Sequence, residues 1–206
     1  MNDVNGESIY RDMTGDGMEM QRAIRNACHG IRPQSALVYL GEEQAWDEFY
    51  GALFNGVLLP HFALVYGASC AGEMDQVIAA DDRLLEQIPA LAAARLSACS
   101  SAVFNARGGA KAIGLLGKLR EKRPECSFTT AFAVHATLFS LPLLQAAMAY
   151  AYIEWSMGAE TAGLAGENPV QWEEMFYSEI IGSSESIREV LARHFNGWKE
   201  IAGGIS

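Results

Sequence analysis

The sequence has few basic residues. Lys and Arg number 15 among 206 residues, against 25 Asp and Glu, which gives a formal net charge of −10 at pH 7. Proteins that bind nucleic-acid phosphates cluster Lys and Arg on one surface, so this charge argues against a nucleic-acid partner. The one basic run, at 118–123, is interrupted by Glu121 and is typical of a solvated helix end.

Paired cysteines and a leader segment are also missing. The four cysteines stand far apart without a C-x-x-C pair, at Cys28, Cys70, Cys99 and Cys126. In a cytosolic protein such residues are mostly small buried apolar groups. Residues 1–15 contain no apolar run of the kind found in secretory signals. The sequence therefore predicts a cytoplasmic protein in which residues 1–16 are loosely ordered.

Charged side chains are absent between Ser127 and Ile153. A membrane span needs about 20 mostly apolar residues, so the stretch is long enough to be one. However, it contains several polar residues, and acidic residues rather than a pair of aromatic and basic anchors follow it. Pro142 in its middle is typical of the first turn of a new helix. We therefore expect two core helices, at about 127–140 and 142–162, and no membrane span.

Strand-like alternation is scarce and is limited to Ala36–Leu40. Helical periodicity runs through most of the chain, and residues 46–57 place their large apolar side chains on one wide helical face. Further helices are predicted at about 60–71, 73–87, 89–106, 109–122, 171–181 and 187–201. A chain of this length can bury a sizeable core. The prediction is an all-α, single-domain bundle of about eight to nine helices over residues 17–206.

Signatures of catalysis or of cofactor binding are missing. The segment Asp12–Asp16 is similar to the start of a calcium loop, but the twelfth position of that loop is Ala23 instead of the required Glu. The glycines near Lys118 lack the remaining residues of a phosphate-binding loop. No pair of histidines, or of glutamate and histidine, has metal-ligand spacing. We therefore predict no metal and no cofactor.

Two histidines are the candidates for a pocket. His61 and His135 are each isolated in the sequence, which is typical of a satisfied core or surface histidine. His135 lies in the uncharged stretch, where a buried imidazole must find a partner or have its pKa lowered.

The first charge after the uncharged stretch, Glu154, is followed by Trp155 and shares a helical face with Tyr150. One interpretation is that the helix leaves the core here and enters water. The other is that these three residues form a partner-binding surface, since exposed aromatics with an acidic rim suit protein recognition. The sequence leaves both interpretations open.

One stretch of the chain resembles a known family. Residues 133–152, AVHATLFSLPLLQAAMAYAY, followed by Glu154–Ala159 and by glycines at 163 and 166, are similar to the central helix pair of the UreF family of urease accessory proteins. The order of the preceding features is also similar, namely Leu59-Pro60 before an apolar helix, an acidic turn at 75–82, and an Ala-rich helix that leads to Gly108-Gly109. The resemblance covers about residues 50–166 and consists of helix order and small-residue content.

The resemblance implies an all-helical, non-catalytic scaffold. Such a protein would assemble with other accessory proteins, with a metalloenzyme apoprotein and with a GTPase during nickel insertion, and a homodimer is compatible with it. Two family features are unmatched. The sequence RPQSAL at 32–37 stands where the family has a Leu-Pro-x-Gly-Gly-Phe-like stretch, and the polar C-terminal tail of the family has no counterpart.

An enzyme is the competing function. All-helical proteins of this size include haem oxygenase-like and thiaminase-like enzymes and small-molecule-binding proteins, which use helix-borne side chains in an enclosed apolar pocket. The candidates here would be His61, His135, Cys99 and Glu154. No spacing in the sequence places a nucleophile beside a base. We therefore expect an accessory protein that acts through protein–protein contacts.

Overall fold

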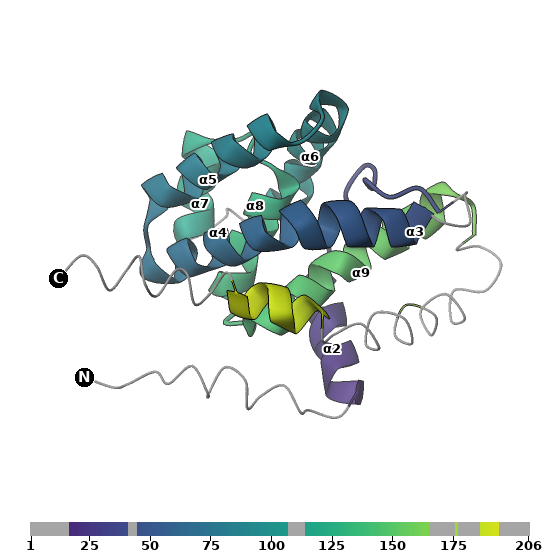
Figure 1. Cartoon of the computed structure of the whole chain (residues 1–206). Helices are drawn as coiled ribbons and strands as arrows, with labels where there is room; N and C mark the ends of the chain where they lie inside the picture. Colours follow the sequence, from purple (N-terminus) through teal and green to yellow (C-terminus); the bar gives the residue numbers. More distant parts are fainter. Residues whose placement is uncertain (1–16, 41–44, 107–113, 165–175, 177–185, 194–206) are drawn as a thin grey trace.

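The computed structural model describes residues 17–40, 45–106, 114–164, 176 and 186–193 (Figure 1). Within these ranges the regular secondary structure is helical, so the predicted all-α class is confirmed. The helices are α2 (Gly17–Cys28), α3 (Ala45–Glu48), η2 (Phe49–Leu58), α4 (Leu59–Ala71), α5 (Met74–Gln87), α6 (Ala90–Phe104), α7 (Gly114–Lys122), α8 (Phe128–Leu138) and α9 (Leu143–Thr161). Residues 186–193 form a further helix, and the described helices bury one common core.

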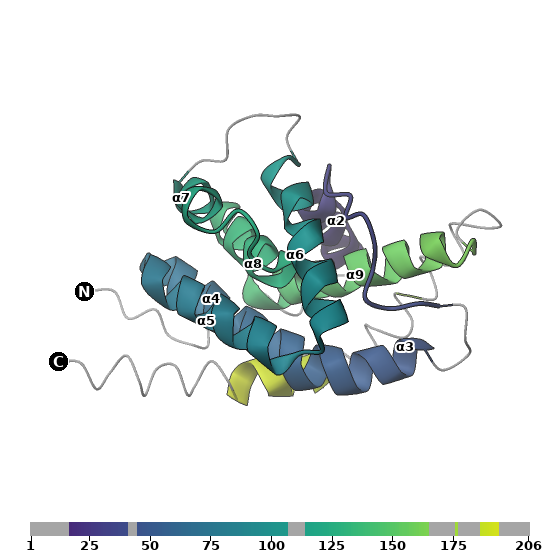
Figure 2. The same cartoon turned by 90° about the horizontal axis from the view of Figure 1, so that it is seen from above.

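Helix α8 occupies the centre of the bundle, and α4, α6, α7 and α9 pack around it (Figure 2). Every residue from Phe128 to Ala136 is buried, which explains why this helix carries no charge on any face. Ser127 begins it, because its side-chain oxygen accepts a hydrogen bond from the Thr130 N–H at 3.1 Å. The chain turns at 139–142, and α9 starts directly after Pro142. The prediction of two helices in the uncharged stretch is confirmed.

Helices α3, η2 and α4 run as one continuous rod (Figure 1). The sequence predicted a separate helix from about residue 60, because proline in a helix interior removes a hydrogen bond and meets the preceding turn. The structure differs because η2 is a π-helix, in which hydrogen bonds reach back five residues. At its end the Leu59 N–H donates to the Phe54 carbonyl, and Pro60 enters where the helix returns to the tighter α spacing.

Within the described residues, Ala45–Cys70 is the one helix long and apolar enough to cross a membrane by length and composition. Of its most apolar 18-residue window, 56% is buried inside the fold. The central helix of a soluble protein has the same character, since its apolar side chains face a core instead of lipid.

The N-terminal part of the described chain lies against α9. Helix α2 packs on α9, and the Cys28 thiol donates to the Ala149 carbonyl at 3.3 Å. After α2 the chain continues without regular secondary structure, so the strand considered for Ala36–Leu40 is absent from this segment. In this segment Val38 lies against Gly158 of α9, whereas the neighbouring Tyr39 is exposed.

Several predicted elements lie outside the described residues. These are the loosely ordered segment 1–16, most of the helix at 171–181, and the last helix beyond residue 193. In that part of the sequence the structure describes Phe176, which is buried, and 186–193.

Candidate functional site

The carboxylate of Glu154 lies inside the protein, with 4% of the residue exposed. Its Oε2 accepts a hydrogen bond from the backbone N–H of Leu37 at 2.8 Å. One turn later, Gly158 lets this segment approach α9, because a Cβ there would lie 2.9 Å from Val38 Cγ1 and 3.1 Å from the Val38 carbonyl oxygen. Glu154 therefore fastens the segment after α2 to the middle of α9.

The environment of Glu154 favours its protonated form. Burial raises the pKa of this carboxyl to about 7, while the backbone N–H groups of Leu37 and Val38 lower it in part. The carboxyl therefore exchanges its proton near neutral pH, inside the core and hydrogen-bonded to backbone from a distant part of the chain.

We expect Glu154→Gln to remove a pH-dependent loss of stability. The pKa of Glu154 is about 7 in the folded chain, against an ordinary value of 4.5, so the folded chain holds this proton more tightly than the unfolded one. The free energy of unfolding of the wild type should therefore fall as pH rises between these values, by about 3 kcal/mol in all. Urea unfolding of both proteins at about pH 5 and about pH 8 measures the difference.

The Gln side chain keeps a carbonyl oxygen that can accept the Leu37 N–H. All other titrating groups are common to the two proteins, so their contributions cancel in the comparison. Relative to the wild type, the variant should gain stability as pH rises. Parallel stability profiles would mean that Glu154 titrates at its ordinary value, contrary to this expectation.

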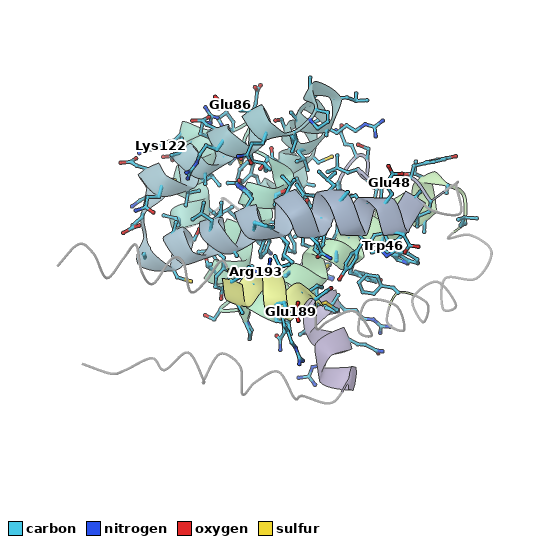
Figure 3. The ribbon with its side chains drawn as sticks, in the orientation of Figure 1. Trp46, Glu48, Glu86, Lys122, Glu189 and Arg193 are labelled. Carbon is cyan, nitrogen blue, oxygen red and sulfur yellow. The ribbon has the colours of Figure 1, made fainter. Side chains whose placement is uncertain are left out.

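Tyr150 and Trp155 are core aromatics. Tyr150 is fully buried, and its hydroxyl lies 2.9 Å from Thr129 Oγ1 on α8. Its ring is surrounded by four phenylalanine rings at centroid distances of 5.7 to 5.9 Å, those of Phe54, Phe62, Phe128 and Phe132. Trp155 meets Trp46 edge-on at 4.7 Å, and Figure 3 shows Trp46 on the side of α3 that faces α9.

The predicted partner-binding surface of Tyr150, Glu154 and Trp155 is therefore corrected, because all three side chains are buried. The alternative, that α9 enters water at Glu154, also fails. The buried carboxyl at this position interacts with backbone donors from residues 37 and 38, more than 100 positions away in the sequence. Helical spacing alone contains no signal for such a partner.

His61 ends a relay of buried hydrogen bonds. Its Nε2 lies 2.8 Å from Thr130 Oγ1. The Thr130 oxygen accepts from the Ser127 hydroxyl at 3.0 Å, and the Ser127 N–H donates to Asp81 Oδ1 at 2.9 Å. Beyond this series, a guanidinium nitrogen of Arg123 lies 3.8 Å from Asp81 Oδ2, which is an ion-pair contact and not a hydrogen bond. Sequence reasoning missed Asp81, which lies in a stretch read as an acidic turn.

Burial and the nearby charge of Arg83 lower the pKa of His61 to about 3, so the ring is uncharged at neutral pH. Because the Ser127 hydroxyl already donates to Thr130, the Thr130 hydroxyl can give its own proton to His61 Nε2, and in that arrangement the ring proton resides on Nδ1.

His135 is also buried but in different surroundings. Its ring lies between those of Phe132 and Phe139, at centroid distances of 6.0 and 4.7 Å. His61 lines a groove of about 240 Å³ between the helix 45–71 and α5, and His135 is not among the residues that line it. This groove therefore does not bring the two histidines together.

Cys99, the thiol considered for an enzyme, donates to the Ser35 carbonyl at 3.3 Å and has no base beside it within the described chain. Cys28, Cys99 and Cys126 are buried, Cys70 is exposed, and all four are free thiols. Burial raises the pKa of the thiols of Cys28 and Cys126 far above the ordinary value. In the ranges that the structure describes, no three His, Cys, Asp or Glu side chains are grouped closely enough to hold a metal ion.

Comparison of the chain with models of protein families, with curated proteins and with solved structures found no match.

Proposed function

We propose that this chain is a non-catalytic accessory protein that acts through protein–protein contacts. The proposal is supported by the hydrogen bonds that the candidate reactive side chains form inside the fold. His61 bonds Thr130, Tyr150 bonds Thr129, and Glu154 bonds the backbone of Leu37. A scaffold uses such groups to fix its shape, whereas acid–base or nucleophilic catalysis requires a nucleophile beside a base.

The resemblance to the UreF family suggests the finer proposal, which is maturation of a nickel metalloenzyme of the urease type in the cytoplasm. The partners would be other accessory proteins or the metalloenzyme apoprotein, and self-association is compatible with this role. A net charge of −10 favours a partner that presents a basic surface, because complementary charge speeds and orients association.

Because Tyr150 and Trp155 are buried, we propose that other residues, on the exterior of the bundle, form the contact with the partner. Among the described residues, Leu91 and Tyr39 are the large apolar side chains with the greatest exposure, at 68% and 54%. Tyrosine is among the residues enriched at binding hot spots, and Leu91 adds apolar area that a partner would cover.

Affinity purification of the chain from its native host, with mass spectrometry and absorbance spectra of the eluate, tests the proposal. Urease subunits, a nickel-handling GTPase or another metalloenzyme apoprotein in stoichiometric amounts would support it. A protein recovered alone with a stoichiometric chromophore, or one that turns over a small molecule, would contradict it and favour the helical-enzyme alternative.

We expect the double substitution Tyr39→Ser and Leu91→Ser to reduce recovery of the partner at least about tenfold, since each removes an exposed apolar contact. Substitutions at exposed positions usually change stability little, so the circular dichroism spectrum and the unfolding midpoint should match the wild type. Undiminished recovery of the same partner would exclude these two side chains from the contact.

A further inference from the structure

The groove beside His61 is lined by both apolar and polar side chains. It measures about 240 Å³ and lies between the rod 45–71 and α5. Val57, Leu64 and Leu84 supply apolar surface, and Gly56 contributes no side chain. A Cβ built at Gly56 has no atom within 4 Å, so the space above this residue is open. The groove is smaller than typical pockets for drug-sized ligands, which measure about 300–1,000 Å³, and therefore suits a small molecule.

Arg83 brings a positive charge to this groove. Its Nε donates to the Ala79 carbonyl at 3.2 Å, and within the described part of the chain no carboxylate oxygen lies within 4.0 Å of its guanidinium. The adjacent Asp82 is paired with Arg123 instead. Glu86, the next acidic residue along α5, projects from the outer face of the helix and does not line the groove (Figure 3). The terminal nitrogens of Arg83 are therefore available to an anion.

His61 presents a second, uncharged polar group to the same groove. Its Nε2 is engaged by Thr130, which leaves Nδ1 as the ring nitrogen for a ligand, and in the tautomer in which Thr130 donates to Nε2 this nitrogen carries the proton. The small exposed part of the residue adjoins the groove. Gln87 adds an amide that can donate or accept. The lining thus contains one positive charge, one uncharged imidazole and one amide beside apolar side chains.

We propose that this groove binds a small organic carboxylate with an apolar body. The carboxylate pairs with the guanidinium of Arg83, whose planar fork matches two carboxylate oxygens. The His61 N–H donates to a polar atom of the ligand, and the apolar body covers Val57 and Leu84. A single full positive charge matches a monoanion better than a doubly charged phosphate. This inference is independent of the proposed accessory function, and failure of either leaves the other untouched.

Titration of the full-length, ¹⁵N-labelled chain with 3-phenylpropionate tests the proposal. We expect saturable shifts of the backbone amides at 56–59, 61–64 and 80–87 and of the His61 ring nitrogens, with an affinity on the order of millimolar for so small a probe. The uncharged 3-phenylpropanamide has nearly the same shape and should bind at least about tenfold more weakly, because it cannot form the ion pair. The absence of saturable shifts at these positions would overturn the proposal.

Two variants separate the groove from non-specific binding. Arg83→Gln should weaken binding of 3-phenylpropionate at least about tenfold. Gly56→Leu should abolish binding by filling the groove, whereas the control Gly51→Leu should leave binding unchanged. Gly51 lies in the same helical segment, does not line the groove, and likewise has no atom within 4 Å of a built Cβ. Equal affinity of the wild type and Arg83→Gln would overturn the proposal even if Gly56→Leu failed to fold.

Discussion

Replacing Tyr150 with alanine should lower the free energy of unfolding by about 4 kcal/mol, the range measured when large buried aromatics are truncated. The side chain is fully buried, its ring touches aromatic rings from η2, α4 and α8, and its hydroxyl bonds Thr129. Aromatic pairs of this kind contribute beyond their buried area. Tyr150→Phe keeps the ring and should cost only about 1 kcal/mol, for the lost hydrogen bond. Equilibrium unfolding in urea measures both changes.

Tyr39→Ala is the matched control, since it removes the same side chain from a position that is 54% exposed. It should change the free energy of unfolding by less than about 0.5 kcal/mol. The two tyrosines also distinguish the interpretations of α9. If Tyr150→Ala had the same free energy of unfolding as Tyr39→Ala but no longer bound its partner, Tyr150 would belong to a contact surface instead of the core.

Gly30→Ala should be comparably damaging, with an expected loss of about 4 kcal/mol. Gly30 has a φ of +77°, in the left-handed region that side chains rarely adopt, and a built Cβ lies 2.2 Å from the carbonyl oxygen of Ala106. Because that oxygen belongs to backbone just after α6, no rotamer change relieves the contact. Strain from an unfavourable φ and overpacking each cost about 1–3 kcal/mol. Thermal or urea unfolding of the variant measures the sum.

Gly72→Ala separates the two causes. Gly72 has nearly the same φ, +76°, at the end of α4, but no atom lies within 4 Å of its built Cβ. This substitution should therefore show only the conformational strain, about 1–2 kcal/mol. Equal losses for the two alanine variants would show that the close approach of Gly30 to Ala106 contributes nothing.

Much of the fold could be predicted from the sequence. The helix pair around Pro142 follows from an uncharged stretch interrupted by a proline, and both the break and the burial are as expected. The continuous rod 45–71 could not be predicted, because its passage through Pro60 depends on a π-helical segment that local propensity does not encode. The irregular path at Ala36–Leu40 could not be predicted either. The alternation of apolar residues there accompanies packing on α9 and not pairing with another strand.

The candidate site was harder to predict. Sequence reasoning chose Glu154 because it is the first charge after an apolar stretch. Its side chain is buried instead of exposed because it meets two backbone N–H groups from a remote segment. His61 was recognised as a pocket candidate. Its relay through Thr130 and Ser127 and its neighbour Arg83 come from three different helices or their caps, which only the tertiary structure brings together. Periodicity identifies which face of a helix is buried but not which distant group meets it.

The docking of the N-terminal segment on α9 has a consequence for synthesis on the ribosome. Leu37 bonds Glu154, 117 residues later, and Cys28 bonds Ala149, 121 residues later. At about 5–20 residues per second, a newly made α2 waits roughly 6–25 s before its counterpart has been translated. During that interval the apolar side chains of Ile24 and Ile31, which end up fully enclosed, have no native surface to cover them. The N-terminal helix therefore reaches its native packing only after most of the chain has been made.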